Sequence, residues 1–260
     1  MISMLKGRTE VVTGGASGIG RATALLLARH GAAVFVGDYD YLPESEPAFT
    51  EAGIVRLPCD VRREQPVREL IERASTDTGR LDILVNCAGI GLTKQITDVT
   101  EAEWDAVLDT NLKGVFLACK QAIPKMRATG GGSIVNIASN AGILPRAHDP
   151  VYSISKGALV ALTKSLALCH AKDRIRVNSV CPGPVQGTRM VDKDLDQAPD
   201  RDAALRDLIH ASPLVKAHGR TIAPEEVAEA VLYLVSDASL MVTGTQLAID
   251  GGKSLGVPPR

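Results

Sequence analysis

Short apolar runs alternate along the chain with longer stretches in which apolar residues recur at helical spacing. The runs are rich in Val and Ile and are apolar at nearly every position, which is typical of strands covered on both faces. Seven runs are predicted as strands: residues 11–13, 32–37, 54–57, 81–86, 133–138, 175–180 and 246–249. The helical stretches between them span residues 20–30, 63–78, 100–126, 151–172 and 224–234.

This alternation predicts the class of fold. Parallel strands need a crossover between them, usually a helix, and such crossovers are right-handed. The sequence therefore predicts an α/β fold in which a doubly wound parallel sheet of seven strands carries helices on both faces, that is, a Rossmann fold. Residues 1–260 contain no repeat, low-complexity segment or linker, so a single domain is expected.

One long stretch departs from the alternation. Residues 187–220 are charged, contain Pro199 and Pro213, and include a single helical pattern at 201–209. An insertion of this length in a compact domain usually forms a lid or a binding element. We therefore predict a lid-like insertion at 187–220, with a solvated surface excursion as the alternative.

Composition narrows the class of protein. Hydrophobic residues make up 45% of the chain and aromatic residues 3%, so the core has to be built from aliphatic side chains. The net charge of −1 gives no electrostatic basis for binding nucleic acid or an anionic membrane. Five cysteines without a CxxC pair, and histidines without metal-ligand spacing, indicate reduced thiols and no metal site. Residues 1–8 lack the apolar stretch of a signal peptide, and no run is long enough to span a bilayer, so we expect a cytoplasmic protein.

A glycine-rich turn follows the first predicted strand. Residues 13–20 read TGGASGIG and lead into a predicted helix, which is the context of a dinucleotide-binding turn. Gly14 allows the sharp turn, Gly18 lets the backbone approach a diphosphate, and Gly20 lets the helix pack on the strand. The helix start offers free N–H groups and a partial positive charge to phosphates. On these residues alone, a purely structural loop is the alternative.

An acid ends the next predicted strand. Asp38 lies eighteen residues after Gly20, where a carboxylate accepts hydrogen bonds from the ribose hydroxyls of an adenosine. It also repels a 2′-phosphate, by roughly 4 kcal/mol for two unit charges about 4 Å apart at an effective dielectric of ~20. No basic residue lies at 16–17 to offset this charge, although Arg62 or Arg63 would do so by folding back. We therefore predict NAD rather than NADP.

A phenol and an ammonium are predicted on one face of a helix. Tyr152 and Lys156 stand four residues apart in YSISK, and a nearby ammonium favours the phenolate and lowers the pKa of a phenol. Ser139 ends a predicted strand, and strand C-termini line the ligand crevice of an open α/β sheet. Its hydroxyl can donate to a substrate oxygen while the tyrosine exchanges its proton. Taken singly, a surface pair and a turn-capping serine are the alternatives.

With these motifs in place, the chain resembles the short-chain dehydrogenase/reductase family over essentially its whole length. NCAG at 86–89 is similar to the family's NNAG motif, with Cys87 in place of the second Asn. TNLKG contains Asn111 and NIASNAG contains Ser139, while CPGP at 181–184 and IDGG at 249–252 resemble the later family motifs. Each motif is weak alone, but all of them in order at family spacing are specific.

The resemblance implies a role for each matched residue. Tyr152 is the general acid/base, Lys156 lowers its pKa and holds the nicotinamide ribose, and Ser139 orients the substrate oxygen. Asn111 holds a water that relays protons through Lys156. Asp60 lies near the adenine and Thr188 binds the carboxamide. The cofactor-binding residues implied are Gly14, Ser17, Gly18, Ile19, Gly20, Asp38, Asp60, Val61, Asn86, Ala88, Gly89, Tyr152, Lys156, Pro182, Gly183, Val185 and Thr188.

Some residues do not follow from the resemblance. Asn140, Arg146, His148 and Arg189 are candidate substrate contacts by position, with solvated loop residues as the alternative. Glu10 stands where the family's first strand has a small apolar residue. A buried carboxylate is costly unless it is paired, so we expect a partner such as Lys6, Arg8 or an arginine on a covering helix.

The expected activity is the NAD-dependent transfer of a hydride between nicotinamide and a secondary alcohol or ketone, such as a sugar, polyol or hydroxy acid derivative. One alternative is a reductase of 3-oxoacyl thioesters, which in this family commonly uses NADPH. The other is a dinucleotide-sensing binding protein without turnover, against which the intact set of four catalytic residues argues. The resemblance also implies a homotetramer.

Overall fold

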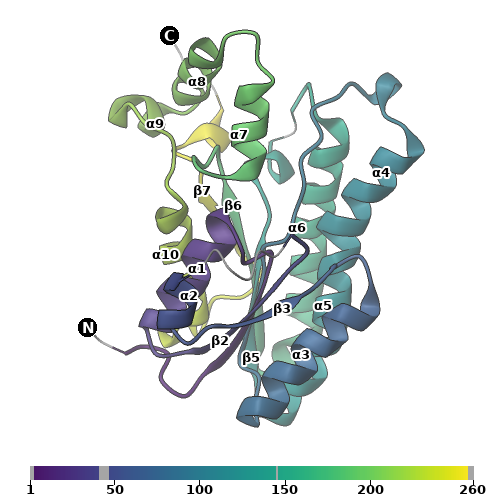
Figure 1. The fold of residues 1–260 in the computed structure, drawn as a ribbon, viewed down its shortest axis with the longest axis vertical. Coiled ribbons are helices and arrows are strands. Elements are labelled where there is room, and N and C mark those ends of the chain that lie inside the picture. The colour runs from purple at the N-terminus through teal and green to yellow at the C-terminus, as the bar shows by residue number, and fades with distance from the viewer. Residues whose placement is uncertain (1–2, 41–46, 145, 257–260) are drawn as a thin grey trace.

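The structure, a computed structural model, describes residues 3–40, 47–144 and 146–256. Its centre is one parallel sheet with the strand order β3-β2-β1-β4-β5-β6-β7 and helices on both faces (Figure 1). The strands are β1 (Thr9–Thr13), β2 (Ala33–Asp38), β3 (Val55–Pro58), β4 (Ile83–Asn86), β5 (Gly132–Ile137), β6 (Ile175–Pro182) and β7 (Gln246–Ile249). The predicted doubly wound sheet of seven strands is confirmed, and every strand begins and ends within two residues of its expected bounds.

Two helical layers bury the sheet. On one face lie α1 (Gly18–Arg29), α2 (Pro47–Glu51) and α10 (Pro224–Val235); on the other lie α3 (Glu64–Thr78), α5 (Gly114–Ala128) and α6 (Pro150–His170) (Figure 1). Successive strand residues serve opposite layers, since Val12 packs with the α1 and α10 layer while Val11 packs with the α3 and α5 layer. This double burial explains why the strand sequences are continuously apolar. No helix in the described part of the chain is both long and apolar enough to cross a bilayer.

The helix predicted over 100–126 is interrupted. Helix α4 (Glu101–Leu108) begins at a capping box formed by Thr100 and Glu103, and it ends in a π-helical turn, Asp109–Lys113, before α5. A π turn widens the helix by one residue, and such turns are frequent at functional sites. Here it contains Asn111, which is fully buried.

The insertion predicted at 187–220 consists of three short helices beyond the carboxyl end of β6. They are α7 (Arg189–Asp196), α8 (Arg201–His210) and α9 (Pro213–His218), of which only α8 was expected from the sequence (Figure 1). The two ends of the insertion meet at its base, where Val185 forms a parallel bridge with Ile222. The Gln186 N–H donates to the Ile222 carbonyl at 2.9 Å, which closes the base.

Glu10 has no hydrogen-bond partner among the residues that the structure describes, and the expectation of one was wrong. Its side chain is 0% exposed in β1, paired in register with Val34 of β2 and Ile83 of β4. Neither carboxyl oxygen has a hydrogen-bond partner among the described residues, because Arg8 pairs with Asp237 at 2.8 Å instead. Burial raises the pKa of Glu10 well above its usual value, so the neutral carboxyl is favoured.

Replacing Glu10 with Gln should stabilise the protein relative to wild type increasingly as the pH rises. Folding raises the pKa of Glu10, so the neutral carboxyl contributes its full stability below the unfolded-state pKa. That contribution is lost as the pH rises through the folded-state pKa. The loss amounts to at most ~1.4 kcal/mol per pH unit, and glutamine does not suffer it. Urea unfolding of both proteins at about pH 5 and about pH 8 measures the effect.

Glu72→Gln is the control, because Glu72 is exposed on α3. It should change stability equally at both pH values. A Glu10→Gln effect with no pH dependence would show that the buried carboxyl does not take up a proton on folding.

Candidate functional site

The glycine-rich turn joins β1 to α1 at the centre of the sheet, where the strand order changes direction between β1 and β4. Gly14 has φ +66°, and a Cβ there would lie 2.5 Å from Cα of Ala88. A Cβ on Gly20 would collide with the carbonyl oxygen of Gly14. Both positions therefore exclude a side chain, and the turn packs directly against the N-C-A-G segment that follows β4.

The start of α1 is left open for an anion. Ser17 is the N-cap in an extended conformation, and its side chain makes no capping hydrogen bond. The first turn carries no acidic residue. The free N–H groups at Gly18 and Ile19 and the helix dipole thus fit a diphosphate lying over the turn. Thr188, at the start of α7, approaches this turn, since its methyl carbon would lie 3.1 Å from a Cβ on Gly18.

Asp38 closes the other end of this crevice. Its Oδ2 accepts a hydrogen bond from the Ala16 N–H at 2.9 Å, and its Oδ1 accepts one from the Asp40 N–H at 3.1 Å. The carboxylate is therefore fixed beside the glycine-rich turn at the end of β2. This position fits the ribose of an adenosine held on the same turn.

Arg62 is bound to Asp60 and reaches Tyr39, the residue that follows Asp38. Its Nε and Nη2 both donate to the Asp60 carboxylate at 2.8 Å, and its guanidinium lies 5.2 Å from the ring centroid of Tyr39. The hydrogen bonds from Arg62 lower the pKa of Asp60. The charge of Arg62 is thus engaged by a carboxylate, while Val61 beside it packs into the core of the sheet.

Ser139, Tyr152 and Lys156 come together at the carboxyl end of β5. Ser139 follows β5, and the other two lie one turn apart near the start of α6; all three are at most 5% exposed. Nζ of Lys156 donates to the Ile137 carbonyl at 2.9 Å and lies 5.8 Å from the ring centroid of Tyr152. The arrangement places a phenol, a hydroxyl and an ammonium within one buried cluster.

Burial controls the protonation of this cluster. It raises the pKa of Tyr152, although the hydrogen bond from Ser139 and the charge of Arg146 act in the opposite direction. It also lowers the pKa of Lys156 to about 8. Loss of solvent outweighs these two interactions, so the pKa of Tyr152 lies above its usual value, and the effect of Lys156 on it stays a prediction.

Asn111 joins three segments next to Lys156. Its Oδ1 accepts from the Ile90 N–H at 2.8 Å, while its Nδ2 donates to the Ile90 carbonyl at 2.9 Å and to Oγ of Ser155 at 3.0 Å. A Cβ on Gly89 would lie 3.3 Å from the Asn111 Oδ1 and 3.4 Å from Nζ of Lys156. The amide and the ammonium therefore both border Gly89.

Ser155 was not predicted from the sequence. It is fully buried, and its hydroxyl donates to the Tyr152 carbonyl at 2.7 Å while it accepts from Asn111. The available signal was its place in YSISK, three residues after Tyr152, which puts it on the helix face next to the tyrosine.

One end of the Asn86 side chain is bound within the sheet, while its Oδ1 has no hydrogen-bond partner among the described residues. Its Nδ2 donates to Oδ1 of Asn136 at 2.8 Å, and Asn136 donates in turn to Oγ1 of Thr163 at 2.9 Å. This buried chain of amides ties β4 to β5 and to α6 beneath the site. The role of Asn86 in holding the cofactor stays a prediction.

The segment after β6 forms the opposite wall. The Gly183 N–H donates to the Ile249 carbonyl at 3.0 Å, which fixes the chain after Pro182 to β7. Thr188 caps the start of α7, and its hydroxyl donates to the Val185 carbonyl at 2.8 Å. These contacts place Thr188 between the sheet and the glycine-rich turn.

The four candidate substrate contacts lie in three places. Arg146 donates from Nη2 to Oδ1 of Asn140 at 2.8 Å, so these two residues lie beside Ser139 and Tyr152. His148 is exposed, with Nδ1 3.3 Å from Nε2 of Gln95. Arg189 pairs with Asp40 at 3.0 Å near the end of β2, so it lies toward the adenosine end of the crevice.

The chain is similar to known proteins over nearly its whole length. A family model described as enoyl-(acyl carrier protein) reductase matches residues 14–254. The chain is 38% identical over 256 residues to the 3-oxoacyl-[acyl-carrier-protein] reductase FabG of Thermotoga maritima, covering 95% of this chain and 98% of that one. It is 40% identical over 249 residues to the cis-4-hydroxycyclohexanecarboxylate dehydrogenase of Sinomonas cyclohexanicum, covering 94% and 96%.

Solved structures share the whole fold. The aldohexose dehydrogenase of Thermoplasma acidophilum superposes with a TM-score of 0.89 at 32% identity, covering 100% of this chain and 99% of that one. The matches in sequence and structure both extend across the glycine-rich turn, the catalytic cluster and the insertion. The chain therefore belongs to the short-chain dehydrogenase/reductase family of oxidoreductases.

Proposed function

We propose that the protein transfers a hydride between NAD(H) and a secondary alcohol or ketone. The observation that carries this proposal is the buried cluster of Ser139, Tyr152 and Lys156 next to an open helix start and a glycine-rich turn. The names of its relatives include a reductase of 3-oxoacyl groups, a dehydrogenase of a hydroxycyclohexanecarboxylate and one of an aldohexose. Each of these names refers to a compound that carries a hydroxyl or a keto group.

The crevice fits a nicotinamide dinucleotide along its length. The turn from Gly14 to Gly20 would hold the diphosphate, Asp38 the adenosine ribose, Lys156 the nicotinamide ribose and Thr188 the carboxamide. When bound, NAD supplies the hydride acceptor, or in its reduced form the hydride donor.

The chain's own residues handle the proton. In reduction, the Tyr152 hydroxyl donates a proton to the carbonyl oxygen while the Ser139 hydroxyl holds that oxygen in place. The raised pKa of Tyr152 keeps the phenol protonated, which is the form that reduction needs, so oxidation should be favoured at higher pH. In keeping with the family resemblance, Asn111 and Lys156 would restore the proton from solvent.

Replacing Tyr152 with Phe should remove nearly all turnover, because the variant has no group to donate or accept the proton. We expect a loss of at least ~100-fold in kcat with NADH binding preserved. A screen of secondary alcohols with NAD⁺, and of ketones with NADH, measured by NADH absorbance, identifies the substrate and then tests the variant. Retained turnover in the variant would contradict the assignment. Tight NADH binding by the wild type without turnover of any compound would favour the dinucleotide-sensing alternative.

The preference for NAD rests on Asp38 and on the engagement of Arg62. The Asp38 carboxylate would face a 2′-phosphate of a dinucleotide held on the turn, and the Arg62 guanidinium donates to Asp60. Arg189, which lies near the end of β2, is paired with Asp40. The local charge therefore opposes an additional phosphate.

NADH should bind more tightly than NADPH, and Asp38→Ser should narrow the difference. The repulsion of a 2′-phosphate by this carboxylate is roughly 1 to 4 kcal/mol, or about five-fold to one-thousand-fold in affinity. Fluorescence titration of each dinucleotide against both proteins measures it. Asp98→Ser, on the exposed turn at Ile96–Asp98, is the control. A wild-type preference for NADPH would overturn the proposal.

A 3-oxoacyl thioester reductase is the second candidate function. The family model carries an acyl-carrier-protein description, and FabG of Thermotoga maritima is a relative at 38% identity. The charge of Asp38 argues against the NADPH dependence common in such enzymes. Activity on an acetoacetyl thioester, compared with a simple secondary alcohol, separates the two candidates.

The substrate class and the cellular setting are further parts of the proposal. The helices α7 to α9 would act as the lid over the substrate, which we take to be a polar alcohol such as a sugar, polyol or hydroxy acid derivative. The polar side chains of Asn140 and Arg146 beside Ser139 support this choice. All five cysteines are free, which accords with a reducing cytoplasm.

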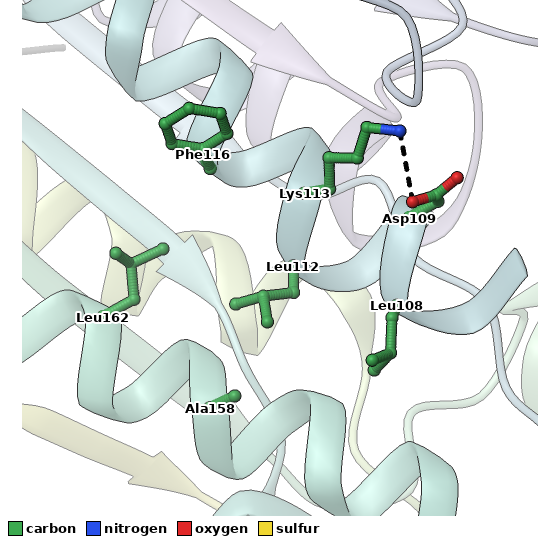
Figure 2. A pocket seen from close by; sticks show the side chains of 7 residues that line it. All are labelled: Leu108, Asp109, Leu112, Lys113, Phe116, Ala158 and Leu162. Carbon is green, nitrogen blue, oxygen red and sulfur yellow. Dashed lines mark hydrogen bonds and ion pairs between the residues drawn. The ribbon is translucent and has the colours of Figure 1, made fainter. Parts of the chain in front are cut away.

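We also propose that the protein is a homotetramer in which α5 and α6 meet a second copy. A groove of about 470 Å³ lies between the π turn and α6, lined by Leu108, Leu112, Phe116, Ala158 and Leu162 (Figure 2). Its rim holds the Lys113–Asp109 ion pair at 3.2 Å, with one charge of each sign. A two-fold axis passing between these two residues would bring Asp109 of each copy next to Lys113 of the other. The charges on this face would then be complementary to themselves.

Phe116→Glu should lower the mass of the assembly in solution. Phe116 is 50% exposed, so a charge there costs the folded monomer little but would have to be buried in the interface. Light scattering after gel filtration measures the mass. Ile96→Glu is the matched control, because Ile96 is 54% exposed on a separate turn. A monomeric wild type, or an unchanged mass for Phe116→Glu, would contradict this assignment.

A further inference from the structure

Arg146 is the centre of a hydrogen-bonded chain that ends at Ser139. Its Nη1 donates to Oδ2 of Asp149 at 3.1 Å, and its Nη2 donates to Oδ1 of Asn140 at 2.8 Å. The same Oδ1 accepts the Ser139 hydroxyl at 3.3 Å. Asp149 thus holds the guanidinium, and the guanidinium fixes the orientation of the amide. The amide oxygen accepts the single Ser139 proton until a substrate oxygen replaces it as the acceptor, so it holds the serine side chain in place beforehand.

The chain is anchored to the first turn of α6. Oγ of Ser153 donates to Oδ1 of Asp149 at 3.3 Å and accepts from the backbone N–H of Arg146 at 3.3 Å. Asn140 and Asp149 are 1% and 6% exposed, so water does not compete for these bonds. Hydrogen bonds between charged groups are stronger and more directional than neutral ones. The anchoring makes the loop before α6 a rigid support for Ser139.

Arg146 also lies against the catalytic phenol. Its Cζ is 5.7 Å from the ring centroid of Tyr152, close to the 5.8 Å of Nζ of Lys156. The other charges that act on the phenol are Asp149 at the start of α6 and Asp194 on α7, both of which disfavour its ionisation. Nζ of Lys156 is directed to the Ile137 carbonyl. Arg146 is therefore a second cation for the phenolate, in addition to the family's lysine.

We propose that Arg146 is a positioning residue that orients Ser139 through Asn140 and stabilises the ionised form of Tyr152. In oxidation, the alcohol proton passes to the phenolate oxygen, and the guanidinium offsets the charge that this oxygen carries beforehand. In reduction, the same charge eases loss of the phenol proton to the carbonyl oxygen. The assignment rests on the proposed function for its kinetic consequences, but its electrostatic part can be measured without a substrate.

The first experiment titrates Tyr152 itself. The chain has four tyrosines, so subtracting the ultraviolet titration of Tyr152→Phe from that of the wild type isolates this phenol. Repeating the subtraction in an Arg146→Met background should move its midpoint upward by about one pH unit. Arg146→Lys should leave the midpoint close to wild type, because the charge is kept.

Two further variants test the sign and the location of the effect. Asp149→Asn should move the midpoint downward, since it removes an anion that disfavours the phenolate. Arg127→Met, which breaks the exposed pair with Asp173 and removes one positive charge elsewhere, should leave it unchanged. Thermal unfolding confirms that each variant is folded; if Arg146→Met is not, Arg146→Lys and Asp149→Asn still decide the outcome. An unmoved midpoint in Asp149→Asn and in folded Arg146→Met would overturn the electrostatic part.

The second experiment tests the positioning of Ser139 once a substrate is known. Both Arg146→Lys and Asp149→Asn should lower kcat by roughly ten-fold with NADH affinity unchanged, because each loosens the support of Asn140. If Arg146 only contacted the substrate, the variants would raise KM and leave kcat and the Tyr152 midpoint at wild-type values. That result would overturn the proposal. A wild type without turnover would reject the proposed function, while the titration would still report on Arg146.

Discussion

The buried ammonium of Lys156 is the constraint on which the site depends. At 3% exposure it has lost nearly all of its solvent, and burial lowers its pKa to about 8. The fold has to supply what water no longer does, and the Ile137 carbonyl at the end of β5 provides a hydrogen bond of 2.9 Å. Gly89 leaves the space beside it, and Asn111 borders the same space. The end of β5, the loop after β4 and the π turn are therefore all shaped around one charge.

The sheet brings this cluster and the glycine-rich turn together at the point where its strand order reverses. Gly14 packs against Ala88 closely enough to exclude a Cβ, so the turn after β1 and the segment after β4 form one surface. Asn86 and Asn136 fix β4 to β5 directly below it. A slip of one residue in either strand would leave these buried amides unpaired, which costs about 1–3 kcal/mol for each group. The crevice is thus held by the register of the sheet rather than by its loops.

Local pattern determined much of this structure, and tertiary contacts determined the rest. The β-branched runs predicted all seven strands because burial on both faces leaves a continuous apolar signature. The π turn was not predicted because the hydrogen bonds of Asn111, which lies in it, go to Ile90 and Ser155. Both partners are distant in sequence, so no local pattern marks the turn. Glu10 was assigned a partner, but a buried carboxyl can instead take up a proton, and sequence does not distinguish the two. The burial that raises the pKa of Tyr152 was likewise not visible, since the sequence displays its charged neighbour but not the loss of water around it.

The closed base of the insertion bears on how such an enzyme changes its substrate during evolution. Val185 and Ile222 are bridged, so everything between them enters and leaves the domain at one point. Changing the length of a loop whose ends are already joined costs little additional entropy, about 0.6 kcal/mol for each doubling. Residues between these two anchors can therefore be replaced, lengthened or shortened while the sheet, the dinucleotide crevice and the proton-transfer groups persist. Diversity of substrates within one scaffold follows from that separation.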